Sequence, residues 1–146
     1  MSTKEAQEKI VANMRRWQRV ENASVASTGQ IIEKTDNPIV RLVMEIIQRD
    51  SQFHYRVQDV IANSLESATL TLAPEELGKV WDLIERHIQI EKEAVQLAKD
   101  SLKVIEGKKG MLVQSYLLSY LLIDEEKHNA VLANLESIKK GMYPYA

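Results

Sequence analysis

Proline and glycine are scarce in this chain and lie far apart, and their spacing constrains the fold more than any other feature. The 146 residues contain only 3 Pro and 5 Gly. Pro38 directly follows Asn37, and Pro74 precedes two acids; both patterns indicate helix starts, because proline suits the first helical position. The Gly-Lys-Lys-Gly sequence at 107–110 indicates a helix stop. So few turn residues are atypical of a β fold.

Four segments of roughly 30 residues lie between these marks, each about 45 Å long if helical. None shows sustained alternation of period two, so no strand is predicted. Ser2 and Glu5 have the spacing of a capping box at the start of the first segment. The predicted helices cover about Thr3–Lys34, Pro38–Thr69, Pro74–Glu106 and Gly110–Lys140. Because short connections make sequential helices antiparallel, the sequence predicts an all-α fold, a single-domain up-down-up-down four-helix bundle over residues 1–146.

Composition excludes several functional classes. The 19 Lys and Arg residues nearly balance the 21 Asp and Glu residues, which argues against a nucleic-acid-binding protein. Without cysteine, the chain can form no disulfide, thiolate metal site or thiol nucleophile. The longest apolar stretch, at 116–123, is far shorter than the roughly 20 residues of a membrane span, and no signal peptide is apparent. We therefore expect a soluble, cytoplasmic protein.

Each predicted helix has an apolar stripe that becomes ionisable in its middle. All three histidines lie on these stripes, and each has a carboxylate four residues away on the same helix face. These pairs are Asp50–His54, His87–Glu91 and Asp124–His128. At a rise of about 1.5 Å per residue, the pairs and Glu21 of the first helix fall at nearly the same level of an antiparallel bundle.

An internal repeat supports this arrangement. EIIQRDSQFHYRV in the second predicted helix matches SYLLIDEEKHNAV in the fourth, and RWQRVENASV in the first matches RHIQIEKEAV in the third. The match pairs Glu21 with Glu91 and His54 with His128. We infer two helical hairpins, each supplying half of a central site.

A buried layer of this kind needs a compensating positive charge. An unpaired buried carboxylate costs several kcal/mol, and carboxylates close together raise one another's pKa. Two divalent metal ions would offset both costs, and carboxylate oxygen with imidazole nitrogen suits iron, manganese or zinc. The alternative interpretation is a metal-free, hydrogen-bonded polar layer that sets helix register.

The segment LLIDEEKHNAVL in the fourth helix resembles the ferritin-like superfamily, in particular rubrerythrin-like proteins. The resemblance implies that Glu125 and His128 form the E-x-x-H metal-binding motif of that family, and that Glu21 and Glu91 are its lone carboxylate ligands. The second helix departs from the pattern, because Ser51 stands three residues before His54.

Two alternatives follow from this departure. If Asp50 replaces the missing glutamate, the repeat makes Asp124 rather than Glu125 its counterpart, so the choice between Asp124 and Glu125 stays open. His87 is a candidate extra ligand. The predicted metal ligands are accordingly Glu21, Asp50, His54, His87, Glu91, Asp124, Glu125 and His128.

The resemblance also implies a function. It favours two bound divalent metal ions, iron first, with manganese or zinc as alternatives, and an oxidoreductase that acts on peroxide or oxidises ferrous iron with oxygen. The alternatives are a non-catalytic metal-binding or storage module and a structural bundle with a metal-free core. Assembly into a homo-oligomer through the outer helix faces is also left open. No nucleic-acid or membrane partner is expected.

Overall fold

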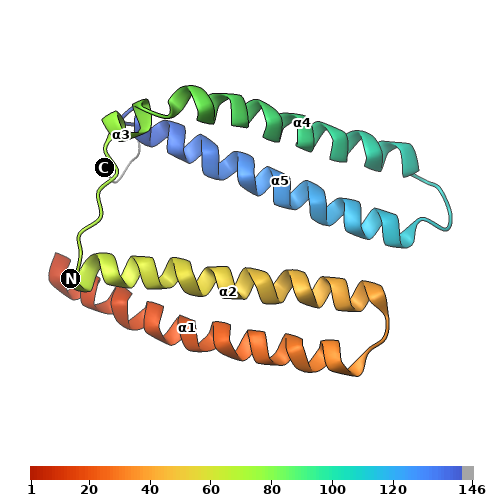
Figure 1. Ribbon diagram of the computed structural model, residues 1–146, viewed down its shortest axis with the longest axis horizontal. Helices are drawn as coiled ribbons and strands as arrows, with labels where there is room; N and C mark the ends of the chain where they lie inside the picture. The colour runs from red at the N-terminus through yellow and green to blue at the C-terminus, as the bar shows by residue number, and fades with distance from the viewer. Residues whose placement is uncertain (143–146) are drawn as a thin grey trace. The chain divides into compact units, whose positions relative to one another are not determined.

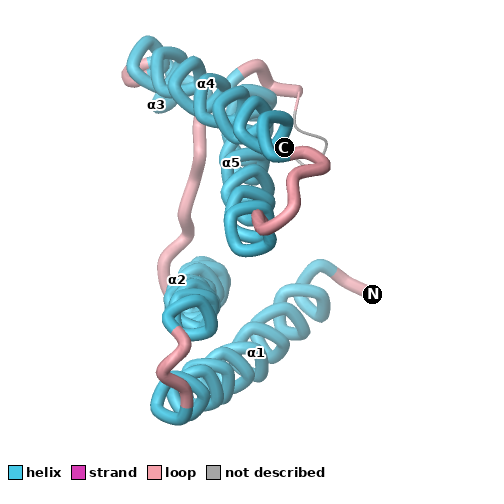
Figure 2. Tube along the Cα trace, turned by 90° about the vertical axis from the view of Figure 1, so that its right-hand side faces the viewer, coloured by secondary structure: helices cyan, strands magenta, loops and turns pink. Residues whose placement is uncertain are grey.

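The structure is a computed structural model that describes residues 1–142. The described part of the chain, residues 1–142, is all-helical, with 84% of its residues in helices and no strand. Two compact units divide it, Met1–Leu70 and Thr71–Ala146. The first unit contains α1 (Thr3–Lys34) and α2 (Pro38–Glu66), and the second contains α3 (Pro74–Gly78), α4 (Trp81–Ile105) and α5 (Leu112–Lys139) (Figures 1 and 2).

The first unit is an antiparallel hairpin whose ends are fixed by the predicted caps. The Ser2 hydroxyl accepts from the Glu5 amide while the Glu5 carboxylate accepts from the Ser2 amide, which completes the capping box. Asn37 caps α2, since its side-chain oxygen accepts from the amides of Ile39 and Val40. Both sequence-predicted helix starts are therefore confirmed.

Polar side chains join α1 to α2 along the whole hairpin. Arg15 reaches α2 near its end, with one guanidinium nitrogen 2.7 Å from Asp59 and the other 2.9 Å from Glu66. Ser24 and Ser51 exchange a hydroxyl hydrogen bond of 2.8 Å near the middle. The later a contact residue lies on α1, the earlier its partner lies on α2. The two helices are therefore antiparallel, as predicted.

In the second unit the predicted third helix is interrupted. The sequence predicts one helix over Pro74–Glu106, but α3 ends at Gly78 and α4 begins at Trp81. Glycine is among the weakest helix formers, and Val80 leaves the helical conformation with φ −119° and ψ 6°. The continuous-helix prediction is therefore wrong at this point, and Leu77 of the short α3 is buried.

The α4–α5 turn uses the predicted glycines. Gly107 and Gly110 have φ of 71° and 77°, in the left-handed region that favours glycine. At the opposite end of this helix pair, the ammonium of Lys139 lies 5.1 Å from the ring centroid of Trp81. These contacts hold α4 and α5 as a second antiparallel hairpin (Figure 1).

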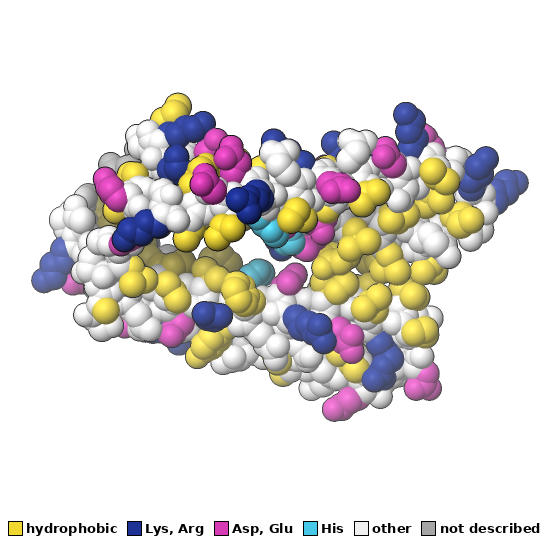
Figure 3. All heavy atoms as spheres, turned by 45° about the horizontal axis from the view of Figure 1, so that its top comes forward, with side chains coloured by type: hydrophobic (Ala, Val, Ile, Leu, Met, Phe, Trp, Pro, Cys, Tyr) yellow, Lys and Arg dark blue, Asp and Glu magenta, His cyan; other side chains and the backbone are white. Residues whose placement is uncertain are grey.

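Much apolar surface stays open along the helices, as the space-filling view shows (Figure 3). None of the large side chains among the described residues is fully buried, and Trp17 is 51% exposed. A two-helix hairpin covers only the strip between its own helices, so the rest of a wider apolar stripe is left uncovered. In the described part of the chain, no helix has the length and apolar character needed to cross a bilayer.

Candidate metal centre

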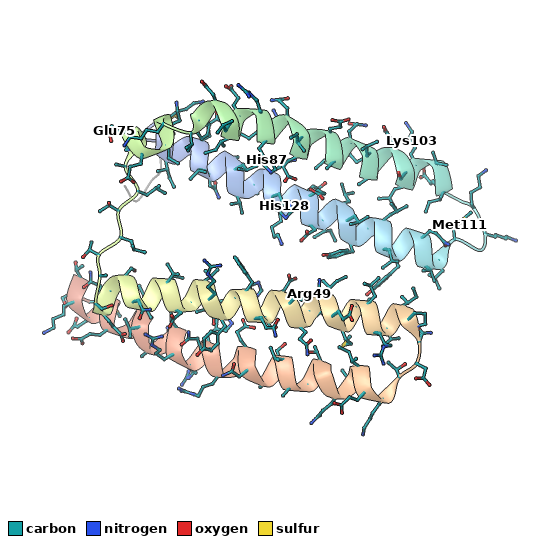
Figure 4. All side chains as sticks on the ribbon, in the orientation of Figure 1. Arg49, Glu75, His87, Lys103, Met111 and His128 are labelled. Atoms are coloured by element: carbon teal, nitrogen blue, oxygen red, sulfur yellow. The ribbon has the colours of Figure 1, made fainter. Side chains whose placement is uncertain are left out.

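Glu91, in the middle of α4, is the centre of the strongest polar cluster in the second hairpin. It is 9% exposed, and each of its carboxylate oxygens contacts an imidazole. Its Oε1 is 2.9 Å from Nε2 of His87, one turn earlier on α4, and its Oε2 is 3.2 Å from Nδ1 of His128 on α5. Figure 4 labels the two histidines near the middle of this helix pair.

Glu125 joins the same cluster from α5. Its Oε2 is 3.3 Å from Nδ1 of His128. The pKa of Glu91 is lowered, chiefly by the hydrogen bond with Glu125. Burial opposes this shift by raising the pKa, and the contacts with His128 and His87 lower it further. The hydrogen bond to Glu91 and burial raise the pKa of Glu125. As the pH rises, Glu91 therefore ionises before Glu125.

The donor set fits a divalent cation. One ligand atom from each of Glu91, Glu125 and His128 lies within 4.8 Å of the other two. Two carboxylates and one imidazole suit iron, manganese or zinc. A cation bound at this place would remove the repulsion between the two carboxylates. A proton on Glu125 has the same effect when no cation is bound.

Asp124 occupies a different place from Glu125. Its Oδ2 lies 3.5 Å from Nε2 of His128, the ring nitrogen that does not face Glu91, and its Oδ1 accepts from Lys127 at 2.7 Å. A carboxylate behind a metal-binding imidazole fixes the orientation and tautomer of the ring. The structure thus brings Glu125 into the cluster and leaves Asp124 behind the imidazole.

The first hairpin holds a second, smaller cluster around Glu21. Glu21 is 6% exposed, and its Oε1 lies 3.5 Å from Nδ1 of His54 on α2. The same oxygen accepts a hydrogen bond of 3.1 Å from Nε2 of Gln58. The structure therefore brings Glu21 and His54 together, as the sequence analysis expected of these two residues.

Asp50 is not part of this cluster. It is exposed and makes no hydrogen bond or ion pair with the other residues that the structure describes. Ser51, at the position where the ferritin-like pattern has glutamate, is buried against Ser24 instead. Spacing of four residues places Asp50 and His54 on neighbouring positions of α2, but the histidine is turned toward Glu21 on the other helix.

Gln58 is the site residue that the sequence analysis missed. It lies one turn after His54 on the inner face of α2 and is 3% exposed. The sequence did contain a signal for Gln58. The internal repeat aligns it with Leu132 of α5, so a polar residue stands on the inner face of α2 where the matching helix has an apolar one.

We compared the chain with protein-family models, with curated proteins and with solved structures, and no match was found in any of the three. The resemblance to ferritin-like proteins therefore depends on the sequence motif alone.

Proposed function

We propose that this protein binds divalent metal ions, and that Glu91, Glu125 and His128 hold one of them. The observation that carries the proposal is that Glu91, Glu125 and an imidazole lie together, with one ligand atom of each within 4.8 Å of the other two. Two adjacent carboxylates need a proton or a cation between them, and a cation of charge two offsets both. His87, which contacts the other oxygen of Glu91, is a candidate fourth donor.

The charge balance of the cluster supports a metal over a purely structural role. Histidines are the basic partners of Glu91, and no arginine in the described part of the chain forms an ion pair with Glu91 or Glu125. A buried carboxylate whose role was only structural would more commonly be paired with a permanent positive charge. Neutral imidazoles are also the form in which histidine binds metals.

The proposal includes the antiparallel four-helix bundle of the ferritin-like type. Leu83, Ile90 and Leu97 on α4 are 60–63% exposed and recur every seven residues, next to the strip that α5 covers. A helix in a four-helix bundle has such a second apolar row, which packs against another helix of the bundle. Closure of the two hairpins onto each other would cover this row, and the sequence repeat predicts that Glu21 and Glu91 then lie at the same level.

Redox turnover is the second candidate, and the ligand count favours it. Three protein ligands leave at least one coordination position for water, peroxide or oxygen on a four- to six-coordinate metal. Bound iron or manganese would supply the redox chemistry. The chain itself would supply Glu91, Glu125 and His128 as ligands, and Asp124 to keep the His128 ring oriented. The non-catalytic alternative is a module that only stores or carries the ion.

Equilibrium dialysis against Mn²⁺, Fe²⁺ and Zn²⁺ with elemental analysis tests metal binding. Wild-type protein should retain metal, and Glu125→Gln should weaken the binding by at least about tenfold. Glu126→Gln is the matched control, because Glu126 is the next residue of α5 and is exposed. Wild-type protein that retains no metal, or equal loss in both variants, would exclude this site.

Turnover is tested separately with iron-loaded protein. Consumption of peroxide and oxidation of added Fe²⁺ should be faster with wild type than with Glu125→Gln, and the control should match wild type. If metal binds but wild type and Glu125→Gln give equal rates, the storage or carrier role replaces the oxidoreductase role.

A further inference from the structure

The buried amide of Gln58 has an unused acceptor beside Glu21. Its Nε2 donates to Glu21 Oε1 at 3.1 Å, but its own Oε1 has no hydrogen-bond partner among the described residues. Gln58 is almost fully buried, with only 3% of its surface exposed. A buried carbonyl oxygen without a partner costs about 1–3 kcal/mol, so its presence calls for an explanation.

An imidazole lies near the same carboxylate as the Gln58 amide. His54 precedes Gln58 by one turn on α2, and its Nδ1 lies 3.5 Å from the same Glu21 oxygen. Ser51, one turn before His54 on α2, is hydrogen-bonded to Ser24 instead. The first hairpin therefore places a carboxylate and an imidazole beside the Gln58 amide, whose carbonyl oxygen would face them after a half-turn of the amide group.

We propose that Gln58 is a metal ligand through its Oε1, and that it completes a second site with Glu21 and His54 inside the first hairpin. Amide oxygen is a usual ligand of hard divalent cations. The inference rests on the proposed function, since the same kind of ion would bind, but it concerns different residues in a different hairpin. Gln58 takes the part that a second carboxylate plays in the α4–α5 hairpin.

The two sites are unequal in charge. Glu91 and Glu125 offer two carboxylates to a cation, whereas Glu21 is the one carboxylate that the first hairpin offers beside Gln58. Because the attraction of a divalent ion grows with the charge of its ligands, the α4–α5 site should fill first and the α1–α2 site should fill at higher metal concentration.

Calorimetric titration of the full-length, metal-free protein with Mn²⁺ tests the inference. Wild type should show two binding steps. Gln58→Leu should weaken the second step by at least about tenfold and leave the first unchanged. Gln58→Glu should strengthen the second step, because it gives the first hairpin a second carboxylate. Gln52→Leu, at an exposed position of the same helix, should leave both steps as in wild type.

The design separates failure of this inference from failure of the proposed function. Glu125→Gln should remove the tighter step and retain the weaker one. A single step in wild type, or a second step that survives Gln58→Leu unchanged, overturns the inference while the α4–α5 site stands. Absence of any Mn²⁺ binding overturns both. Leucine occupies the matching position of α5, so metal-free Gln58→Leu should fold.

Discussion

Replacing Glu125 by glutamine should change stability in opposite directions without and with metal. The ligand atoms of Glu91 and Glu125 lie within 4.8 Å of each other. At that separation two carboxylates repel by about 1 kcal/mol in a water-like dielectric and by about 3.5 kcal/mol at an effective dielectric constant of 20. Their side chains are 12% and 25% exposed, so the true value lies between these limits.

In metal-free protein a proton on Glu125 relieves this repulsion at low pH, and the repulsion appears as Glu125 ionises. The folded-state pKa of Glu125 is raised above the ordinary 4.5, so its contribution to stability is complete below pH 4.5 and is lost as the pH rises through the raised pKa. Glutamine needs no such proton and can still donate to Glu91. At pH 7.5 the Glu125→Gln variant should therefore be more stable by about 1 kcal/mol, which raises the melting temperature by about 2–4 °C.

Metal reverses the sign. Ligand binding to the native state raises the melting temperature of wild type by mass action, and the variant gains less because it lacks a charged ligand. Thermal unfolding followed by circular dichroism, in EDTA and in excess Mn²⁺ from pH 4.5 to 8, measures both effects, with Glu126→Gln as the control. A variant that melts below wild type in EDTA, or equal shifts in EDTA and in Mn²⁺, would refute the reasoning.

Two further predictions concern the hairpins themselves. Arg15→Met should lower the melting temperature, because it removes the guanidinium contacts with Asp59 and Glu66. The decrease should be larger at low salt than at about 1 M salt, because salt screens these ion pairs. A decrease that does not depend on salt would assign the effect to packing. Gly107→Ala should lower the free energy of unfolding in urea by about 1–2 kcal/mol, because the φ of Gly107 is 71°. Gly78→Ala should not lower it, because the added carbon meets open space. A similar decrease in both variants would contradict the backbone argument.

The positions of most helices could be predicted from the sequence because their signals are local. A capping box, an asparagine cap before Pro38 and two glycines at the α4–α5 turn act within a few residues, and the structure confirms each of them. The break between Gly78 and Trp81 was missed because the surrounding sequence keeps helical periodicity across it. The family resemblance and the four-helix bundle stay predictions.

The candidate site could be predicted in part. Residue spacing correctly joined His87 to Glu91, which are four apart on one helix and 2.9 Å apart in space. The same spacing failed for Asp50 and His54, because sharing a helix face does not fix which way a side chain turns.

The sequence by itself determined where most of the helices lie and which ionisable residues share a level within each hairpin. Both follow from short-range steric preferences and the regular rise of a helix. The tertiary structure placed Glu125 rather than Asp124 beside Glu91, and it placed Gln58 beside Glu21. The rotation of each helix about its own axis sets which side chain meets the neighbouring helix, and that rotation depends on packing between segments distant in the chain.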